Sequence, residues 1–284
     1  MSGYESKYID LEDVTLHMKV AGDAAGEPVI LLHGFPEFWY GWRHQIDALA
    51  GEGYRVIVPD QRGYNKSSKP DGTGAYHIDK LRDDILGIMD HFGMDQANIA
   101  GHDWGGAVGW HLASTRPRRV KKFIAVNIPH PAVMPEAVKK YPKQIFKSLY
   151  IGFFQIPGVP EKVLSTGNYR NMARALTASG RKNTFSEEDL DRYKASWSEE
   201  GALTGMLNWY RAAPKSISAL RKDVPVPTQI IWGTGDQFLS KELAEESFKL
   251  LASGDIAWIE AATHWVMHER PEIVNRHMLR FLKK

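Results

Sequence analysis

The sequence predicts an α/β fold, in which a mostly parallel sheet is flanked by helices and interrupted by one helical insertion. Short runs of apolar, largely β-branched residues are typical of strands covered on both faces of such a sheet. The clearest runs are Val29–Leu32, Arg55–Val58 and Phe123–Val126. Between them, apolar side chains from Ile78 to Phe92 recur at steps of three and four residues, which predicts a helix that Gly93 ends. This alternation of strand and helix predicts right-handed crossovers between parallel strands.

The remaining elements follow the same pattern on both sides of the insertion. Apolar and polar residues alternate from Val14 to Val20, which predicts a strand with one face in water. The further predicted elements are strands at Ala97–Ala100, Gln229–Trp232 and Ile256–Ile259, a helix from about Lys241 to Leu251 and a last helix with Pro271 in its first turn.

The insertion begins after Asn127 and continues for about a hundred residues, until the strand at Gln229. It is rich in proline, lysine and helical patterns, and no linker-like tract separates it from its flanks. We therefore expect a helical cap that lies on the core. The predicted division is a core of residues 1–129 and 224–284 and a cap of residues 130–223.

Composition limits the possible functions. The 284 residues include no cysteine, which excludes thiolate nucleophiles, disulfides and Cys-ligated metal sites. The 36 Lys and Arg nearly balance 34 Asp and Glu and are spread along the chain, so neither a nucleic acid nor a membrane partner is expected. With no long apolar segment, we expect a cytoplasmic protein, whose oligomeric state the sequence does not predict. Nine Trp, eleven Tyr and eleven Phe suffice for an apolar pocket that binds a small ligand.

The most informative motif is Gly101-His102-Asp103-Trp104-Gly105-Gly106, which follows a predicted strand and opens a helical pattern. It matches the strained strand-to-helix elbow that exposes a nucleophile above a sheet, with Asp103 in the place where many hydrolases have serine. The alternative is that Asp103 only caps the following helix.

A second motif, His33-Gly34-Phe35-Pro36, follows directly on a predicted strand. In this architecture, a backbone N–H at that place contributes to an oxyanion hole, together with the N–H after the nucleophile. The expected donors are the backbone N–H groups of Phe35 and Trp104. The alternative is a structural turn with a cis Pro36.

Two further side chains follow later strands, Asp236 after Gln229–Trp232 and His264 after Ile256–Ile259. The chain order Asp103, Asp236, His264 is the nucleophile, acid, histidine order of α/β-hydrolases. Taken alone, Asp236 could cap a helix and His264 could be a buried structural histidine. A zinc site at His264 and His268 is disfavoured because the glutamate after the first histidine is missing. We expect no metal and no cofactor.

A carboxylate nucleophile restricts the substrate. A carboxylate is ionised at pH 7 and needs no base to attack, but its attack on an acyl carbon gives a reactive anhydride. Attack on a saturated carbon gives an ester that a histidine-activated water can hydrolyse. An epoxide or an alkyl halide is therefore the expected electrophile. An opening epoxide needs a proton donor, for which tyrosine is suited, but from composition alone Tyr150 and Tyr210 of the insertion are better explained as packing residues.

Together, these residues resemble the soluble and microbial epoxide hydrolases of the α/β-hydrolase fold, over essentially the whole chain. The motifs that carry the resemblance are His33 to Glu37, Trp42 to Gln45, Asp60 to Tyr64, Gly101 to Gly106, Ile128 to Pro131, Phe154 to Gly158, Asn208 to Arg211 and the surroundings of Asp236 and His264. The resemblance implies an eight-stranded sheet with a helical cap and a reaction that converts an epoxide to a vicinal diol with water. Asp103 is then the nucleophile, His264 the general base and Asp236 its orienting partner.

The resemblance also changes the interpretation of the cap tyrosines. One family tyrosine lies four residues before the Phe-Gln of Phe154 to Gly158 and another lies within Asn208 to Arg211, so Tyr150 and Tyr210 become the expected epoxide-activating acids. The expected lining of the pocket is Phe35, Trp104, Phe154 and Trp265.

Two alternatives stay open. Haloalkane dehalogenases resemble this chain, but they usually have Asn at the place of Phe35, and some take their acid from the position of Asn127. Fluoroacetate dehalogenases place Arg where this chain has Trp104. A catalytically silent receptor that binds a small apolar ligand is the non-enzymatic alternative, which a complete set of five catalytic side chains disfavours.

Overall fold

One eight-stranded sheet forms the centre of the molecule. The computed structural model describes residues 3–216 and 219–284. The strand order is β1-β2-β4-β3-β5-β6-β7-β8; β1 and β2 pair antiparallel, as do β2 and β4, and all later neighbours pair parallel. The strands are β1 (Glu5–Asp10), β2 (Thr15–Ala21), β3 (Pro28–Leu32), β4 (Arg55–Pro59), β5 (Ala97–His102), β6 (Val120–Val126), β7 (Thr228–Gly233) and β8 (Gly254–Ile259).

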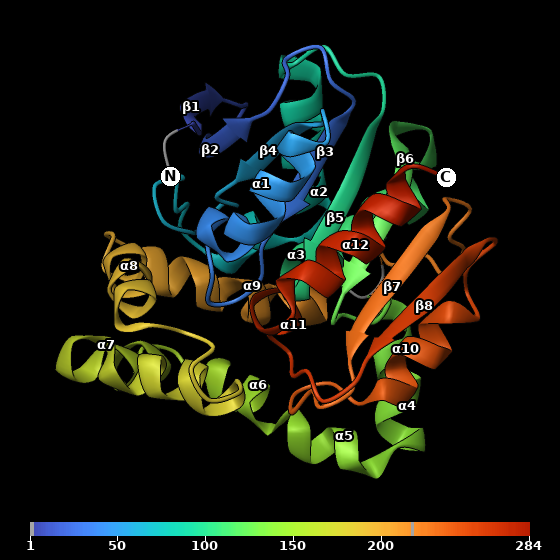
Figure 1. Cartoon of the computed structure of the whole chain (residues 1–284). Helices are drawn as coiled ribbons and strands as arrows, with labels where there is room; N and C mark the ends of the chain where they lie inside the picture. The colour runs from blue at the N-terminus through green and yellow to red at the C-terminus, as the bar shows by residue number, and fades with distance from the viewer. Residues whose placement is uncertain (1–2, 217–218) are drawn as a thin grey trace.

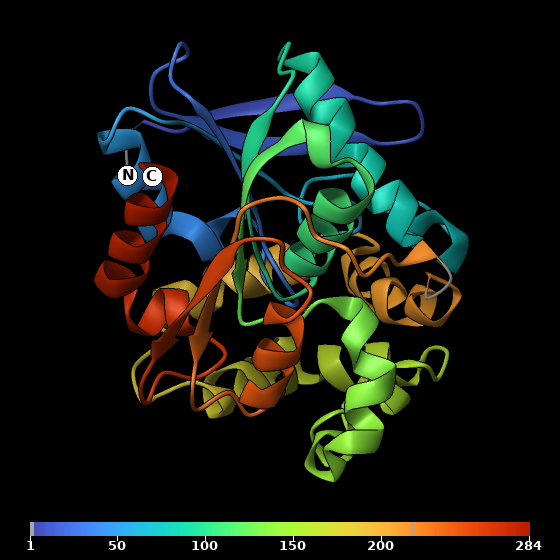
Figure 2. The same ribbon diagram turned by 90° about the vertical axis from the view of Figure 1, so that its right-hand side faces the viewer.

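Helices cover both faces of this sheet, as Figures 1 and 2 show. Those of the core are α1 (Arg43–Gly51), α2 (Ile78–His91), α3 (Asp103–Thr115), α10 (Lys241–Phe248), α11 (Val266–Glu269) and α12 (Pro271–Leu282). The apolar sides of α1 and α12 form one buried cluster with one face of the strands, and those of α2, α3 and α10 form a second cluster with the other face. Burial on both faces explains why the central strands are apolar throughout.

Among the described residues between β6 and β7 are six α-helices, which lie near the carboxyl ends of the parallel strands (Figure 1). They are α4 (Met134–Lys140), α5 (Pro142–Lys147), α6 (Leu149–Phe154), α7 (Val159–Ser179), α8 (Glu187–Trp197) and α9 (Ala202–Ser216). Helix α7 is broken in the middle, where Thr166 to Tyr169 have non-helical dihedral angles. The division between core and cap at residues 129/130 and 223/224 stays a prediction.

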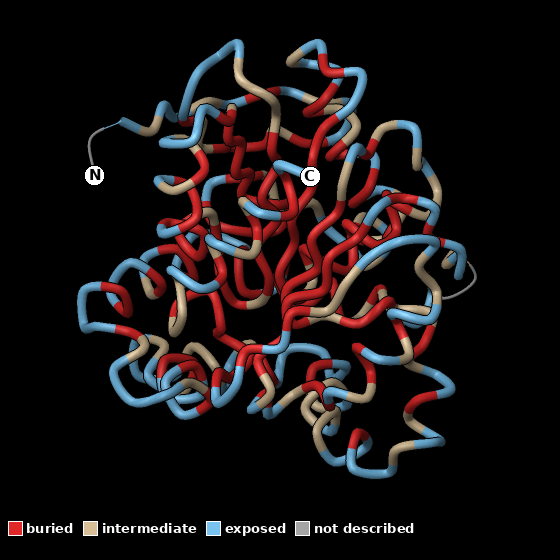
Figure 3. Tube along the Cα trace, turned by 45° about the vertical axis from the view of Figure 1, so that its right-hand side comes forward, coloured by how far each residue is buried: buried red, intermediate tan, exposed pale blue. Residues whose placement is uncertain are grey.

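The predicted fold class is confirmed: the protein has an eight-stranded, mostly parallel sheet with flanking helices in the α/β-hydrolase arrangement. Buried residues follow the central strands, and the outer edges of the inserted helices are exposed (Figure 3). Strand β1 was not predicted, because its sequence is largely exposed and charged and pairing with β2 alone makes it a strand. In the described parts of the chain, no helix is long and apolar enough to cross a membrane.

Candidate active site

The elbow motif forms the junction between β5 and α3. Asp103 is the first residue of α3 and has a positive φ of 49°, a strained angle for a residue other than glycine. The neighbouring chain approaches so closely that a Cβ on Gly105 would lie 2.2 Å from the carbonyl oxygen of Leu32. A Cβ on Gly34 would likewise lie 2.4 Å from the Asp103 Cβ. These glycines therefore allow the loop after β3 to lie against the Asp103 side chain.

One backbone donor holds an oxygen of Asp103. The Phe35 N–H donates a hydrogen bond of 2.9 Å to Asp103 Oδ1. Trp104 is the second residue of α3, where a backbone N–H has no partner within the helix. The preceding His33 is fixed by Gln61, whose backbone N–H donates to His33 Nε2 at 3.0 Å. The peptide bond between Phe35 and Pro36 is cis.

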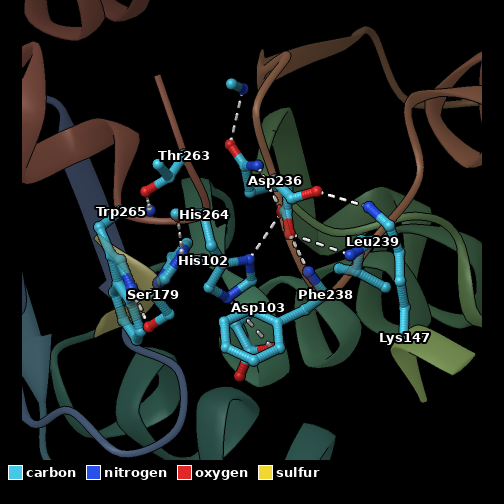
Figure 4. A network of polar contacts seen from close by, with 12 residues as sticks. His102, Asp103, Lys147, Ser179, Asp236, Phe238, Leu239, Thr263, His264 and Trp265 are labelled. Carbon is cyan, nitrogen blue, oxygen red and sulfur yellow. Dashed lines mark hydrogen bonds and ion pairs between the residues drawn. The ribbon is translucent and has the colours of Figure 1, made fainter. Parts of the chain in front are cut away.

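His264 lies between two carboxylates, as Figure 4 shows. Its Nδ1 is 2.8 Å from Asp236 Oδ2, and its Nε2 is 3.7 Å from Asp103 Oδ2. All three residues are buried. The structure thus brings together the three residues predicted from different ends of the chain, with His264 in the middle.

The electrostatics of this pair favour charge on Asp236 and protonation on His264. Burial alone would lower the pKa of His264, but the attraction of Asp236, their hydrogen bond and the charge of Asp103 raise it above the ordinary value of 6.5. Burial would raise the pKa of Asp236, yet His264 and the donors around the carboxylate lower it. Asp236 therefore remains an anion that orients the imidazole.

An apolar cavity of about 140 Å³ opens beside Asp103. It is lined by Asp103, His264, Tyr150 and Tyr210 together with Phe35, Phe154, Leu164, Phe238, Trp265 and others. Asp236 lies behind His264, outside the lining. The Trp104 ring, which we expected in the pocket, is not part of this lining and packs against Tyr210, with ring centroids 5.1 Å apart.

The two cap tyrosines face the cavity from different helices, Tyr150 from α6 and Tyr210 from α9. Their ring centroids are 6.0 Å apart. Burial and then the charge of Asp103 raise the pKa of Tyr150, and burial together with Tyr150 and Asp103 raises that of Tyr210 well above its ordinary value. Both hydroxyl groups therefore stay protonated and can donate hydrogen bonds into the cavity.

Two residues that form hydrogen bonds with Asp236 were not predicted from the sequence as part of the site. Asn127 Nδ2 donates to Asp236 Oδ2 at 2.6 Å, and its Oδ1 accepts from the Gly233 N–H at 2.9 Å. Lys147 of α5 donates a hydrogen bond of 2.6 Å to the backbone carbonyl oxygen of Asp236 (Figure 4). This bond connects α5 to the loop that contains Asp236. The position of Asn127 after β6 was a usable signal, whereas nothing near Lys147 in the sequence indicated its partner.

A buried polar cluster around Glu37 was also missed. The Glu37 carboxylate is within 2.7 Å of both Tyr193 Oη and His268 Nε2 and within 3.0 Å of His102 Nδ1. The other nitrogen of His102 lies 2.9 Å from the carbonyl oxygen of His264. The cluster therefore connects helix α8 with the backbone of His264.

The charge of Glu37 stabilises this cluster. Burial alone would raise the pKa of Glu37, but His268 and His102 hold it well below its ordinary value. We expect Glu37→Gln to lower the free energy of unfolding by about 3 kcal/mol, because it leaves the buried polar groups of Tyr193, His268 and His102 without the anion that they face. Urea unfolding measures this change. The control Glu52→Gln removes an exposed ion pair with Lys283 and should lower the free energy of unfolding far less; equal effects would contradict the assignment.

Comparisons with known proteins show which family this chain belongs to. A family model described as the alpha/beta hydrolase fold matches residues 27–271. The AB hydrolase superfamily protein YfhM of Bacillus subtilis (strain 168) is 49% identical over 284 residues, covering 100% of this chain and 99% of its own. Epoxide hydrolase 1 of Caenorhabditis elegans is 38% identical over 100% of this chain and 72% of its own.

Solved structures give the same result. The Bacillus megaterium epoxide hydrolase in complex with an inhibitor superposes with a TM-score of 0.90 at 32% identity, over 98% of this chain and 100% of its own. Epoxide hydrolase A from Mycobacterium thermoresistibile superposes with a TM-score of 0.88 at 30% identity, over 99% and 98% of the two chains. The chain therefore belongs to the α/β-hydrolase fold family and, within it, to the epoxide hydrolases.

Proposed function

We propose that this enzyme converts an epoxide to a vicinal diol in two steps, through a covalent ester on Asp103. The observation that carries the proposal is the position of the Asp103 carboxylate, at the nucleophile elbow, with one oxygen on the Phe35 N–H and the other toward His264. A hydroxyl nucleophile would need the histidine as its base, whereas a carboxylate leaves His264 for water. A cytoplasmic location stays a prediction.

In the first step, Asp103 Oδ2 attacks a ring carbon of the epoxide and the carbon–oxygen bond of the ring breaks. The electron pair goes to the epoxide oxygen, which takes its proton from Tyr150 or Tyr210. The raised pKa values of both tyrosines support this role, because both hydroxyl groups carry a proton at neutral pH. Asp103 Oδ1 becomes the carbonyl oxygen of the ester and keeps its hydrogen bond from Phe35.

In the second step, His264 takes a proton from water, and the hydroxide attacks the carbonyl carbon of the ester. The negative charge that develops on Oδ1 is stabilised by the N–H groups of Phe35 and Trp104. The bond between this carbon and Oδ2 then breaks, and the leaving alkoxide takes the proton of the re-formed Asp103 carboxyl group, so the diol leaves with an oxygen that belonged to Asp103. The proton on His264 returns to the tyrosine that gave up its own in the first step. Asp236 stabilises the protonated His264, consistent with its 2.8 Å contact.

A single turnover in water enriched in heavy oxygen tests the covalent route. With enzyme in excess over styrene oxide, the first diol should contain only light oxygen, because the label enters Asp103 instead. Mass spectrometry of the diol and of the peptide that carries Asp103 measures both. Full solvent label in the first diol would show direct attack by water and overturn the proposal.

We expect both tyrosines to donate hydrogen bonds to the epoxide oxygen during ring opening. We expect Tyr150→Phe or Tyr210→Phe alone to lower kcat/KM about 10-fold to 100-fold, since one donor remains, and the double variant to lose about 10³-fold or more. Initial rates of diol formation measure this. Tyr141→Phe, which removes a hydroxyl group bonded to Glu246 and not to the cavity, is the control. A double variant no slower than the control would exclude both tyrosines as acids.

The two steps should respond differently to pH. In the free enzyme, Asp236 and Asp103 both raise the pKa of His264. Formation of the ester removes the charge of Asp103, so we expect a lower pKa of His264 in the ester. Ester hydrolysis needs neutral His264 and should slow as pH falls through that lower value. Stopped-flow decay of the ester and nuclear magnetic resonance titration of free His264 measure the two midpoints; a hydrolysis midpoint at the higher pH would contradict this order.

A further inference from the structure

Exposed apolar side chains are concentrated on one part of the inserted helices. Ten large apolar residues are exposed in the described parts of the chain, and six of them lie between residues 145 and 163. These six, here called the cap patch, are Ile145, Phe146, Leu149, Ile156, Val159 and Val163. Phe146 is 73% exposed and Leu149 is 63% exposed, which is unusual for residues of this size when they have no partner.

The cap patch is accompanied by positive charge. Residues 134–163 contain five lysines and two glutamates, a net charge of +3, whereas the whole chain has only +2. Both glutamates are paired outside this segment, Glu136 with Lys222 and Glu161 with Arg211. Among the residues that the structure describes, Lys139, Lys143 and Lys162 form no ion pair. Two of them lie beside the patch: Lys143 is one helical turn from Phe146 in α5, and Lys162 is next to Val163 in α7.

The cap patch is also the outer side of the wall that encloses the cavity. Helices α5, α6 and α7 follow one another along the side of the molecule that lies at the carboxyl ends of the strands (Figure 1). Helix α6 exposes Leu149 while its Tyr150 and Phe154 line the cavity. Helix α7 exposes Val163 while its Leu164 lines the cavity. In α6 and α7, a single layer of helices therefore separates the cavity from the surface of the cap patch.

We propose that the cap patch docks this enzyme on the surface of an anionic lipid bilayer, without spanning it. Apolar side chains beside lysines on short helices are the combination that inserts into the headgroup region of such bilayers. A second copy of the chain fits less well, because a two-fold contact between the patches would bring lysines against lysines. The near-neutral charge of the whole chain predicted no membrane partner, and this local excess departs from that expectation.

Sedimentation of the full-length protein with vesicles tests the docking directly. Vesicles with about a third phosphatidylglycerol in phosphatidylcholine should bind the protein at low salt, and high salt should weaken binding because it screens the lysines. We expect at least about tenfold weaker binding for Phe146→Glu and about fivefold or more for Lys143→Gln. Tyr8→Glu, which changes a 56% exposed aromatic residue on β1, is the matched control and should bind as the unchanged protein does.

The competing outcomes are distinct. No binding to anionic vesicles, or equal binding of Phe146→Glu and the unchanged protein, would overturn the proposal. A dimer in sedimentation velocity that Phe146→Glu dissociates would assign the cap patch to a second copy and would also overturn it. The docking does not rest on the proposed reaction: Phe146→Glu should keep its diol formation from a water-soluble epoxide, so loss of binding and failure of the active site are separate results.

Discussion

Asp103→Asn should lower the rate of diol formation by at least about 10⁴-fold, as the loss of a nucleophile does in other hydrolytic triads. Asparagine is the substitution that changes least else. It is nearly isosteric, it tolerates the positive φ of this position better than most residues, and its oxygen can still accept the hydrogen bond from Phe35. In the proposed mechanism it removes the anion that attacks the epoxide carbon, so the defect should appear in the first turnover.

Asp79→Asn provides the control for charge. It removes one carboxylate that pairs with Arg82 and His111 on α2 and α3, away from the cavity. We expect its activity within a factor of about two of the unchanged protein, since neither partner lines the cavity. Rapid-quench measurement of the first diol, with circular dichroism to verify folding, compares the two. If a folded Asp103→Asn variant formed diol at a rate similar to that of Asp79→Asn, covalent catalysis by Asp103 would be excluded.

The central strands could be predicted because residues that are buried on both faces of a sheet are apolar, and this is visible in the sequence. Burial on both faces leaves Val29–Leu32 and Phe123–Val126 almost without polar side chains, and the structure has β3 and β6 there. The edge strand β1 has the opposite character. Its residues are mostly exposed, so nothing in their polarity distinguishes a strand from a loop, and only the pairing with β2 makes it a strand.

The presence or absence of a local sequence signal also explains which residues of the site could be predicted. Asp103, Asp236 and His264 each follow a recognisable strand, so their chain order pointed to a common place at the carboxyl edge of the sheet. The Glu37 cluster has no such signal. Its members come from four separate segments, and only the folded chain places the Glu37 carboxylate against Tyr193 and His268. The break within α7 did have a signal, because Gly167 and Asn168 lie in it and both residue types tolerate the positive φ found there.

His264→Gln should stop the reaction after its first step. Ring opening uses Asp103 and the tyrosines, so we expect a burst of one epoxide consumed per active site. Hydrolysis of the ester then lacks its base, and steady-state turnover should fall about 10³-fold to 10⁴-fold. The trapped ester should appear as a mass increase equal to the whole epoxide, located on the peptide that contains Asp103.

His268→Gln is the matched control, because it replaces another buried histidine four residues later in the same segment. Its partners are Glu37 and Arg43, and it does not line the cavity. We expect this variant to be less stable but to complete turnovers without accumulating an adduct. If His264→Gln consumed epoxide steadily, the general base would have to be another group. If a folded His264→Gln variant formed neither the burst nor the adduct, His264 would be needed to form the ester. That result would contradict the proposal that His264 acts only in the second step.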